Sequence, residues 1–311
     1  MEGENKTQVS EFILLGFSIP HQMSILLFVV FLIMFLFTFA ANGVIITVIR
    51  ADLRLHSPMY FFICNLSFLD MCFLSSTIPT CLRGFLWEKS TITLVGCVSQ
   101  MYIGISMGAT QGVLLSVMAW DRYVAICNPL NYHRIVNKAI CIKLAICTWA
   151  SGFLISLVSV SFAMAAPFCG PNKINHVVCE VAAVLRLACI DIHFFEIQLF
   201  VVSVIVLVAP LSLIIFTYLH IISTILRMPT AAGRHKAFST CGSHLIVVSL
   251  FYGTTILIYM SPRSMISTES EKVISLMYGL LTPTLNPLIY SLRNNAVKGS
   301  LKKLFHRNPN C

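Results

Sequence analysis

The sequence has few charged residues. Lys, Arg, Asp and Glu make up 11% of the 311 residues, whereas a soluble domain carries about 25%. Hydrophobic residues make up 57%, and the mean hydropathy is +0.85. The chain also contains long runs without a charged residue, of a length that ordinary soluble enzymes do not have. Most of the chain is therefore predicted to lie in a lipid bilayer.

The apolar residues gather in seven long runs. A helix needs about 20 such residues to cross the hydrocarbon core, and the short alternating segments of a membrane barrel are not found in the sequence. The sequence therefore predicts an all-α membrane protein, a single domain built as a seven-transmembrane helix bundle. The predicted parts are an outer tail over 1–22, spans over about 23–49, 56–82, 94–120, 142–165, 197–226, 237–260 and 273–292, and a cytoplasmic tail over 293–311.

Lysine and arginine set the predicted orientation. With the N-terminus outside, 14 of the 21 basic residues fall on the cytoplasmic side, against the two acidic residues Asp52 and Asp121. The positive-inside rule favours this arrangement. The net charge of +9 is thus interpreted as a topology signal, and no nucleic-acid partner is predicted. The outer tail has no basic region typical of a signal peptide, and its sequon predicts glycosylation of Asn5.

Four of the twelve cysteines fall on the outer side: Cys97, Cys169, Cys179 and Cys189. They allow three pairings, and spacing alone does not choose among them. The long loop over 168–196 would then fold over the outer mouth of the bundle. His176, Cys179 and Glu180 resemble a metal-binding set, but an oxidised cysteine cannot bind as a thiolate. No metal and no cofactor is predicted.

Asp70 is the only acid in the middle of a span, where an ionisable group is costly and usually functional. Asn42, Asn286 and, from the third span, Gln111 are its predicted polar partners. Such a set can hold a sodium ion or ordered water, or serve as a hydrogen-bond hub. Gln111 is neutral, which weakens a sodium site because a hard cation prefers anionic oxygen. The alternatives stay open.

Asp121 and Arg122 directly follow the third apolar run. Arg122 could be an interfacial anchor whose charge reaches the headgroups. Alternatively, an acid–base pair that opens at this boundary is a two-state element for a cytoplasmic partner. Taken alone, the pair favours the anchor.

Longer sequence motifs favour the two-state element over the interfacial anchor. Asp121-Arg122-Tyr123 and the run Asn286-Pro287-Leu288-Ile289-Tyr290 resemble the two hallmarks of rhodopsin-like receptors. Four strings narrow the resemblance to vertebrate odorant receptors, and within them to the terrestrial-vertebrate subgroup: LHSPMYFF (55–62), MAWDRYVAIC (118–127), KAFSTCGSHL (236–245) and PTLNPLIYSLRN (283–294). The resemblance covers the whole chain.

The resemblance implies an odorant receptor in the plasma membrane, in olfactory cilia, that activates a stimulatory, olfactory-type heterotrimeric G protein and raises cyclic AMP. It also implies the disulfides Cys97–Cys179 and Cys169–Cys189. Arg122 would contact Tyr218 or the G protein in the active state, while the base of the sixth helix swings outward. The implied activation residues are Asp121, Arg122, Tyr123, Tyr218, Lys236, Asn286, Pro287 and Tyr290.

One face of the third span carries mostly small residues: Gly104, Ile105, Gly108, Ala109 and Gly112. Spacing alone favours close helix packing over a cavity, but the resemblance places a ligand pocket on this face. The other predicted pocket residues are Val202, Val206, Tyr252, Thr255, Ile256, Tyr259, Leu276 and Gly279. Tyr252 is also the expected switch aromatic, because the sixth span lacks the usual Trp and Pro.

The predicted ligand is a small, mostly neutral, hydrophobic volatile. Gly104 stands where amine receptors carry an Asp, so the resemblance disfavours amines. Burial of one CH₂ contributes ~0.8 kcal/mol, which for a small odorant predicts roughly micromolar affinity. A receptor for an endogenous lipid or metabolite stays an alternative, since an apolar pocket suits both.

The cytoplasmic tail carries an apolar stripe of Val297, Leu301, Leu304 and Phe305 opposite basic residues. This pattern predicts a short amphipathic helix on the inner leaflet, in contact with membrane lipid. A transporter or channel would need further ionisable groups along a path or an inverted repeat, and the sequence has neither. It also lacks the H-E-x-x-H and G-x-S-x-G motifs, so an enzyme is not predicted.

Overall fold

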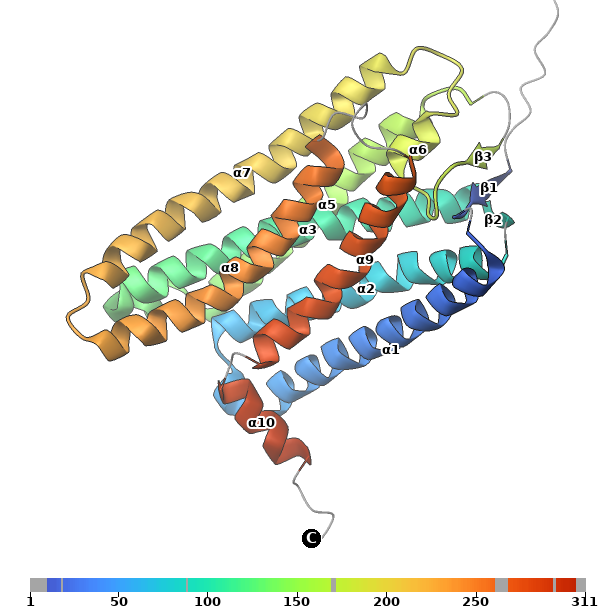
Figure 1. Cartoon of the computed structure of the whole chain (residues 1–311). Helices are drawn as coiled ribbons and strands as arrows, with labels where there is room; N and C mark the ends of the chain where they lie inside the picture. The colour runs from blue at the N-terminus through green and yellow to red at the C-terminus, as the bar shows by residue number, and fades with distance from the viewer. Residues whose placement is uncertain are drawn as a thin grey trace, which may run out of the picture.

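The computed structural model describes residues 10–17, 19–87, 89–168, 172–260, 268–292 and 295–305. Seven of its helices are long and apolar enough to cross a membrane, which confirms the predicted seven-helix bundle (Figure 1). In chain order these are α1 (His21–Ala51), α2 (Pro58–Leu86), α3 (Leu94–Cys127), α5 (Lys138–Met164), α7 (His193–Leu226), α8 (Ala231–Met260) and α9 (Thr268–Leu292).

Several helices extend beyond the apolar run that predicted them. α3 continues past Trp120 to Cys127, so Asp121 and Arg122 lie within the helix. Polar caps fix two of the helix starts, since the side chains of Thr93 and Asn137 accept hydrogen bonds from backbone N–H groups of the first turns of α3 and α5, each at 3.1 Å.

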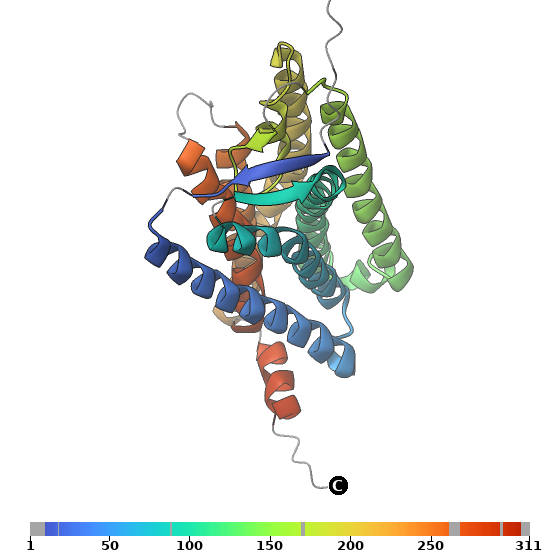
Figure 2. The same ribbon diagram turned by 90° about the vertical axis from the view of Figure 1, so that its right-hand side faces the viewer.

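α3 is the most enclosed helix. In its most apolar window 67% of the residues are buried, against 11% in α1 and in α7. α3 packs against α2, α5, α7 and α8, and it runs through the middle of the bundle in Figures 1 and 2. The apolar outer faces of α1 and α7, with Ile33 and Ile205 among their exposed residues, are left for lipid.

The contact between α3 and α5 depends on a glycine. A Cβ atom at Gly152 would lie 2.7 Å from the backbone oxygen of Ser106 and closer still to the Thr110 hydroxyl. Four residues further along α5, the Ser156 hydroxyl donates a 2.6 Å hydrogen bond to the backbone oxygen of Tyr102. Small residues thus let two helix backbones approach closely, as in other membrane bundles.

A small sheet covers one end of the bundle, called the outer end here because the charge pattern predicts that it lies outside the cell (Figures 1 and 2). The central strand β1 (Glu11–Leu15) pairs antiparallel with β2 (Lys89–Thr93) and parallel with β3 (Lys173–Ile174). The sequence prediction treated this segment as part of a tail. Phe12 and Leu14 point inward and are buried, which is the two-residue alternation of a half-buried strand.

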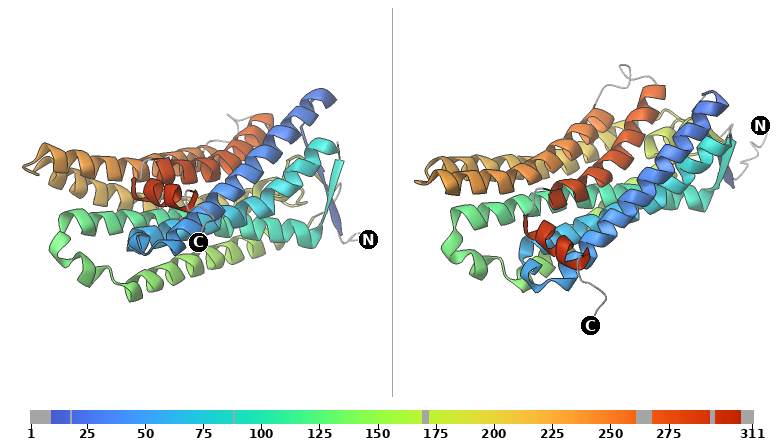
Figure 3. Two further views of the ribbon diagram at one scale, coloured as in Figure 1. Left: turned by 90° about the horizontal axis from the view of Figure 1, so that it is seen from below. Right: turned by 60° about the horizontal axis from the view of Figure 1, so that its bottom comes forward.

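Short elements complete the chain: the 3₁₀ turns η1 (Leu53–Leu55) and η2 (Pro129–Asn131), and the helices α4 (Tyr132–Ile135), α6 (Val181–Leu185) and α10 (Asn295–Phe305). α10 is the predicted C-terminal helix, and it lies away from the sheet end (Figure 3). Val297 is buried, and the Ser300 hydroxyl donates a 2.6 Å hydrogen bond to Asp52, which joins α10 to the turn after α1. Hydrogen bonds from Arg54 and then Ser300 hold the pKa of the Asp52 carboxyl well below its usual range.

Candidate functional site

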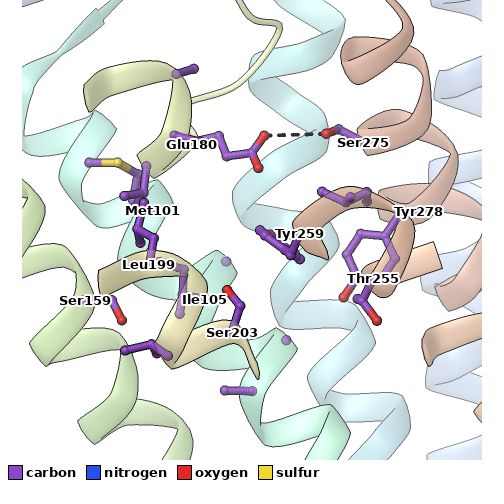
Figure 4. A pocket seen from close by; sticks show the side chains of 18 of the residues that line it. Met101, Ile105, Ser159, Glu180, Leu199, Ser203, Thr255, Tyr259, Ser275 and Tyr278 are labelled. Carbon is purple, nitrogen blue, oxygen red and sulfur yellow. Dashed lines mark hydrogen bonds between the residues drawn. The ribbon is translucent and has the colours of Figure 1, made fainter. Parts of the chain in front are cut away.

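A cavity of about 670 Å³ opens in the outer half of the bundle (Figure 4). Its walls come from α2, α3, α5, α7, α8 and α9, and the loop between α5 and α7 covers it. Small-molecule sites measure about 300–1,000 Å³ and combine an apolar lining with a few polar groups. This cavity has that size and that chemistry.

Eight of the thirteen residues predicted for the pocket line this cavity: Gly104, Ile105, Gly108, Ala109, Val202, Val206, Thr255 and Tyr259. The other five lie elsewhere: Gly112, Tyr252, Ile256, Leu276 and Gly279. The face of α3 on which the resemblance placed the pocket therefore borders this cavity, but the cavity does not extend as far along α3 as Gly112.

Packing explains where those five residues lie. The Tyr252 hydroxyl fills the space above Gly112, where an added Cβ would lie 3.3 Å from the Tyr252 oxygen. At Gly279 an added Cβ would lie 3.5 Å from the Phe73 ring. Leu276 is buried in a cluster with residues of α1 and α2, and Ile256 packs against the core of the inner half.

The cavity also has polar groups that the sequence prediction missed. Figure 4 shows Ser203 and Tyr278 near its centre, beside the predicted Tyr259, with Glu180 and Ser275 above them. Further lining residues that the prediction missed include Phe73, Thr77, Gln100, Ser159, His176, Arg186 and Glu196. Periodicity within one helix could not find those that come from the outer loop, because tertiary contacts set the place of the loop.

The outer loop is pinned over the cavity by a disulfide. Cys97 at the start of α3 is bonded to Cys179 in the loop, as the resemblance implied. The backbone N–H of Cys179 donates a 2.8 Å hydrogen bond to Gln100 Oε1, and Gln100 Nε2 donates one of the same length to the backbone oxygen of Ser76. The lid is thereby tied to both α2 and α3.

The second predicted disulfide involves residues at the edge of the described chain. Cys189 is disulfide-bonded, whereas Cys169 lies outside the described residues, as does the predicted glycosylation site Asn5. Within the described ranges, no three His, Cys, Asp or Glu side chains are grouped as a metal site would require.

The predicted polar hub lies below the cavity. Asn286 Nδ2 donates a 2.9 Å hydrogen bond to Asp70 Oδ2. Asn42 instead donates to the backbone oxygens of Thr38 and Pro283, at 3.1 and 3.4 Å, so its amide is not bonded to Asp70. Within the described part of the chain, four buried atoms of the hub have no hydrogen-bond partner: Asn42 Oδ1, Asp70 Oδ1, Gln111 Nε2 and Asn286 Oδ1. Buried groups of this kind normally bind ordered water or another polar partner.

At the inner end of α3, Asp121 is held by the first residue of α4. The Tyr132 hydroxyl donates a 2.8 Å hydrogen bond to Asp121 Oδ1, and burial together with the Asp121 charge raises the pKa of Tyr132. Arg122 Nε is buried and has no hydrogen-bond partner among the described residues.

Tyr218 bonds to His244 in this structure. Its hydroxyl lies 2.8 Å from His244 Nδ1, and His244 Nε2 lies 3.1 Å from the backbone oxygen of Leu115. The three residues connect α7, α8 and α3 in the inner half. The predicted contact between Arg122 and Tyr218 concerned the active state and stays a prediction.

The remaining predicted activation residues lie around the same inner half. The Tyr123 ring packs edge-on against His220, with 5.9 Å between the ring centroids. Pro287 lies within α9, and the buried Tyr290 hydroxyl has no partner in the part of the chain that the structure describes. Lys236 lies in α8, and its side chain is outside the described residues.

Comparisons with known proteins agree with this geometry. A family model described as "Olfactory receptor" matches residues 31–308. "Olfactory receptor 2K2" of Homo sapiens is 48% identical over 304 residues, which covers 98% of this chain and 96% of that protein. "Olfactory receptor 10A7" of Homo sapiens is 48% identical over 300 residues, covering 96% and 95%. The crystal structure of squid rhodopsin matches 92% of this chain and 86% of its own, with a TM-score of 0.71 and 17% identity, which supports the fold alone.

Proposed function

This chain belongs to the olfactory receptor family, and from that premise we propose that it binds a small hydrophobic volatile in the outer cavity and activates a stimulatory, olfactory-type G protein. Members of this family are multi-pass membrane receptors and not enzymes. They respond to small-molecule ligands and signal through G proteins. One observation carries the proposal: α3 forms a wall of the cavity at its outer end and carries Arg122 at its inner end.

The cavity chemistry supports an apolar ligand body. Ile105 and Val206 line it beside Gly104 and Gly108, whose missing side chains leave room. Each CH₂ of a ligand buried there contributes ~0.8 kcal/mol, and the costs of binding leave roughly micromolar affinity for a volatile of that size. The hydroxyls of Ser203 and Thr255 offer directed hydrogen bonds.

The transduction step needs a movement between helices. α8 is held against α3 by Tyr252 in the middle and by His244 in the inner half. A ligand that packs against Tyr259, about two turns above Tyr252, biases that contact, because an effector shifts an equilibrium only through contacts that differ between two states. The inner end of α8, with Lys236, then moves away and exposes Arg122 to the G protein, which raises cyclic AMP.

The location of the signalling residues supports the orientation predicted from charge. Arg122 and the basic α10 share the cytoplasmic side, the N-terminus is outside, and the cell is an olfactory neuron with the receptor in its cilia. The buried polar atoms around Asp70 that have no hydrogen-bond partner among the described residues could bind ordered water or a sodium ion. Water is favoured over sodium, because the set contains one carboxylate and otherwise neutral amides.

The test is a cyclic AMP assay in cells that express this chain with an olfactory G protein α subunit, against a panel of small volatiles. Arg122→Ala is expected to abolish the response while the receptor still reaches the surface. Lys138→Ala is the matched control, since Lys138 is exposed at the start of α5. A response that persists in Arg122→Ala contradicts the proposed coupling. Silence of the surface-expressed parent receptor, together with a response to lipids or metabolites, contradicts the proposed ligand class.

A further inference from the structure

Glu180 is a carboxylate built into the cavity wall. It follows Cys179, whose disulfide and hydrogen bond to Gln100 fix that part of the loop to α3. Its side chain is 23% exposed, and it faces the cavity (Figure 4). A carboxylate held in this way by a covalent anchor is a preorganised acceptor, so little conformational entropy is lost when a ligand binds to it.

Two polar side chains lie beside the Glu180 carboxylate. The Ser275 hydroxyl donates a 3.5 Å hydrogen bond to Oε2, and His176 Nε2 lies 3.3 Å from the same oxygen. Neither neighbour carries a permanent positive charge, so these two contacts do not pair Glu180 with a lysine or an arginine.

The charges of the lining favour a cation. Besides Glu180, the cavity is lined by the carboxylate of Glu196, the guanidinium of Arg186 and the imidazole of His176. Among the described residues of the lining, two carboxylates against one guanidinium leave one net negative charge when His176 is neutral. In a cavity with apolar walls this charge is screened less than it would be in water.

Aromatic rings lie on the same side of the cavity. Figure 4 places Tyr259 and Tyr278 below Glu180, and the Phe73 ring packs edge-on against Tyr278, with 6.0 Å between centroids. The face of an aromatic ring attracts an ammonium group, and the attraction grows when water is excluded. A carboxylate beside aromatic rings is the combination that recognises protonated amines.

We propose that the cavity takes a small protonated amine, with the ammonium group between the Glu180 carboxylate and the Tyr259 and Tyr278 rings and the apolar body on Ile105 and Val206. This inference rests on the proposed function and names the ligand class of the same site. It reverses the expectation drawn from Gly104, because here the counter-ion comes from the outer loop and not from α3.

The experiment compares matched ligands on the full-length receptor. For each of several carbon skeletons, the primary amine and the alcohol are titrated in the cyclic AMP assay. The unmodified receptor is expected to respond to an amine at a concentration about tenfold or more below that of its alcohol, which corresponds to one charge-assisted contact. Alcohols as potent as the amines, or amines that are silent while alcohols act, would overturn the inference and leave the proposed function standing.

Variants of Glu180 test whether its charge determines the preference for amines. Glu180→Gln keeps the shape and a hydrogen-bond acceptor, so amine potency is expected to fall about tenfold while alcohol potency changes less than about threefold. Glu180→Asp should retain part of the amine preference. Glu11→Gln is the matched control, because Glu11 is exposed in β1 and does not line the cavity. An equal loss for amines and alcohols in Glu180→Gln, or a loss of amine potency in Glu11→Gln, would refute the assignment.

Surface staining accompanies every variant. If Glu180→Gln fails to reach the surface, the amine and alcohol pairs on the unmodified receptor still decide the question. Silence toward every ligand of both classes at a well-expressed receptor would instead overturn the proposed function, and the inference with it.

Discussion

The Tyr252 hydroxyl donates a 3.1 Å hydrogen bond to the backbone oxygen of Gly112, directly beneath the cavity. The absence of a side chain at Gly112 makes the contact possible, since an added Cβ would lie 3.3 Å from that hydroxyl. At this point of the bundle one aromatic side chain and one backbone oxygen join α3 to α8, in addition to the contact of His244 with Leu115 further along the two helices. The contact separates the ligand cavity from the inner half, where the signalling residues lie.

Removal of this hydrogen bond is expected to affect stability more than ligand binding. Tyr252→Phe should cost about 0.5–1.5 kcal/mol, the usual net contribution of such a bond, while ligand affinity changes little because Tyr252 is outside the cavity. Tyr259→Phe, the matched control, lines the cavity and should show the opposite pattern. Thermal unfolding and ligand binding of the purified receptor would measure both, and a loss of affinity confined to Tyr252→Phe would contradict this division.

A leucine at position 108 is expected to fill the cavity. The Cβ of a residue there has only the Tyr278 hydroxyl within 4 Å, at 3.6 Å, so the rest of the side chain would occupy ligand volume. Gly108→Leu should abolish responses to apolar ligands without loss of surface expression. Gly43→Leu is the control, because a Cβ added at Gly43 in α1 would meet no atom within 4 Å and Gly43 does not line the cavity. An unchanged response in Gly108→Leu would place the ligand elsewhere.

Larger residues at Gly152 are expected to destabilise the bundle. Gly152→Val would force a Cβ to within 2.7 Å of the Ser106 backbone oxygen, and overpacking of this kind costs typically about 1–3 kcal/mol. Ala150→Val makes a similar increase in volume on the exposed face of α5 and should be tolerated. The thermal midpoint in detergent would show the difference, and equal midpoints for the two variants would mean that α3 and α5 separate at little cost.

Loss of the Tyr132 hydroxyl is expected to weaken signalling. Tyr132→Phe removes the hydrogen bond to Asp121, which is 1% exposed, and a buried carboxylate without a donor seeks another partner. The neighbouring Arg122 is that partner, and a paired Arg122 is less available to a G protein. The maximal cyclic AMP response per surface receptor should fall. Tyr102→Phe, in the outer half, is the control, and an equal response in both variants would assign Tyr132 a purely structural role.

Much of the fold follows from the sequence. The apolar runs set the seven helices because backbone polar groups in a bilayer must bond within their own segment. For these seven helices only the ends differed from the predicted spans, since a helix continues beyond its apolar run as far as its caps and packing allow. The strand β1 was overlooked, although the alternation of Phe12 and Leu14 was visible; its partners β2 and β3 are distant in sequence, and pairing alone makes it a strand.

The candidate site divides in the same way. The sequence by itself determined which face of α3 is lined by small residues, where the basic residues gather and which signalling motifs are present, because these depend on composition and helical period. Only the tertiary structure decided the depth of the cavity, through the contact of Tyr252 with Gly112, and the entry of Glu180 into its wall. A loop has no period of its own, so the disulfide and the hydrogen bond to Gln100 determine where its charge lies.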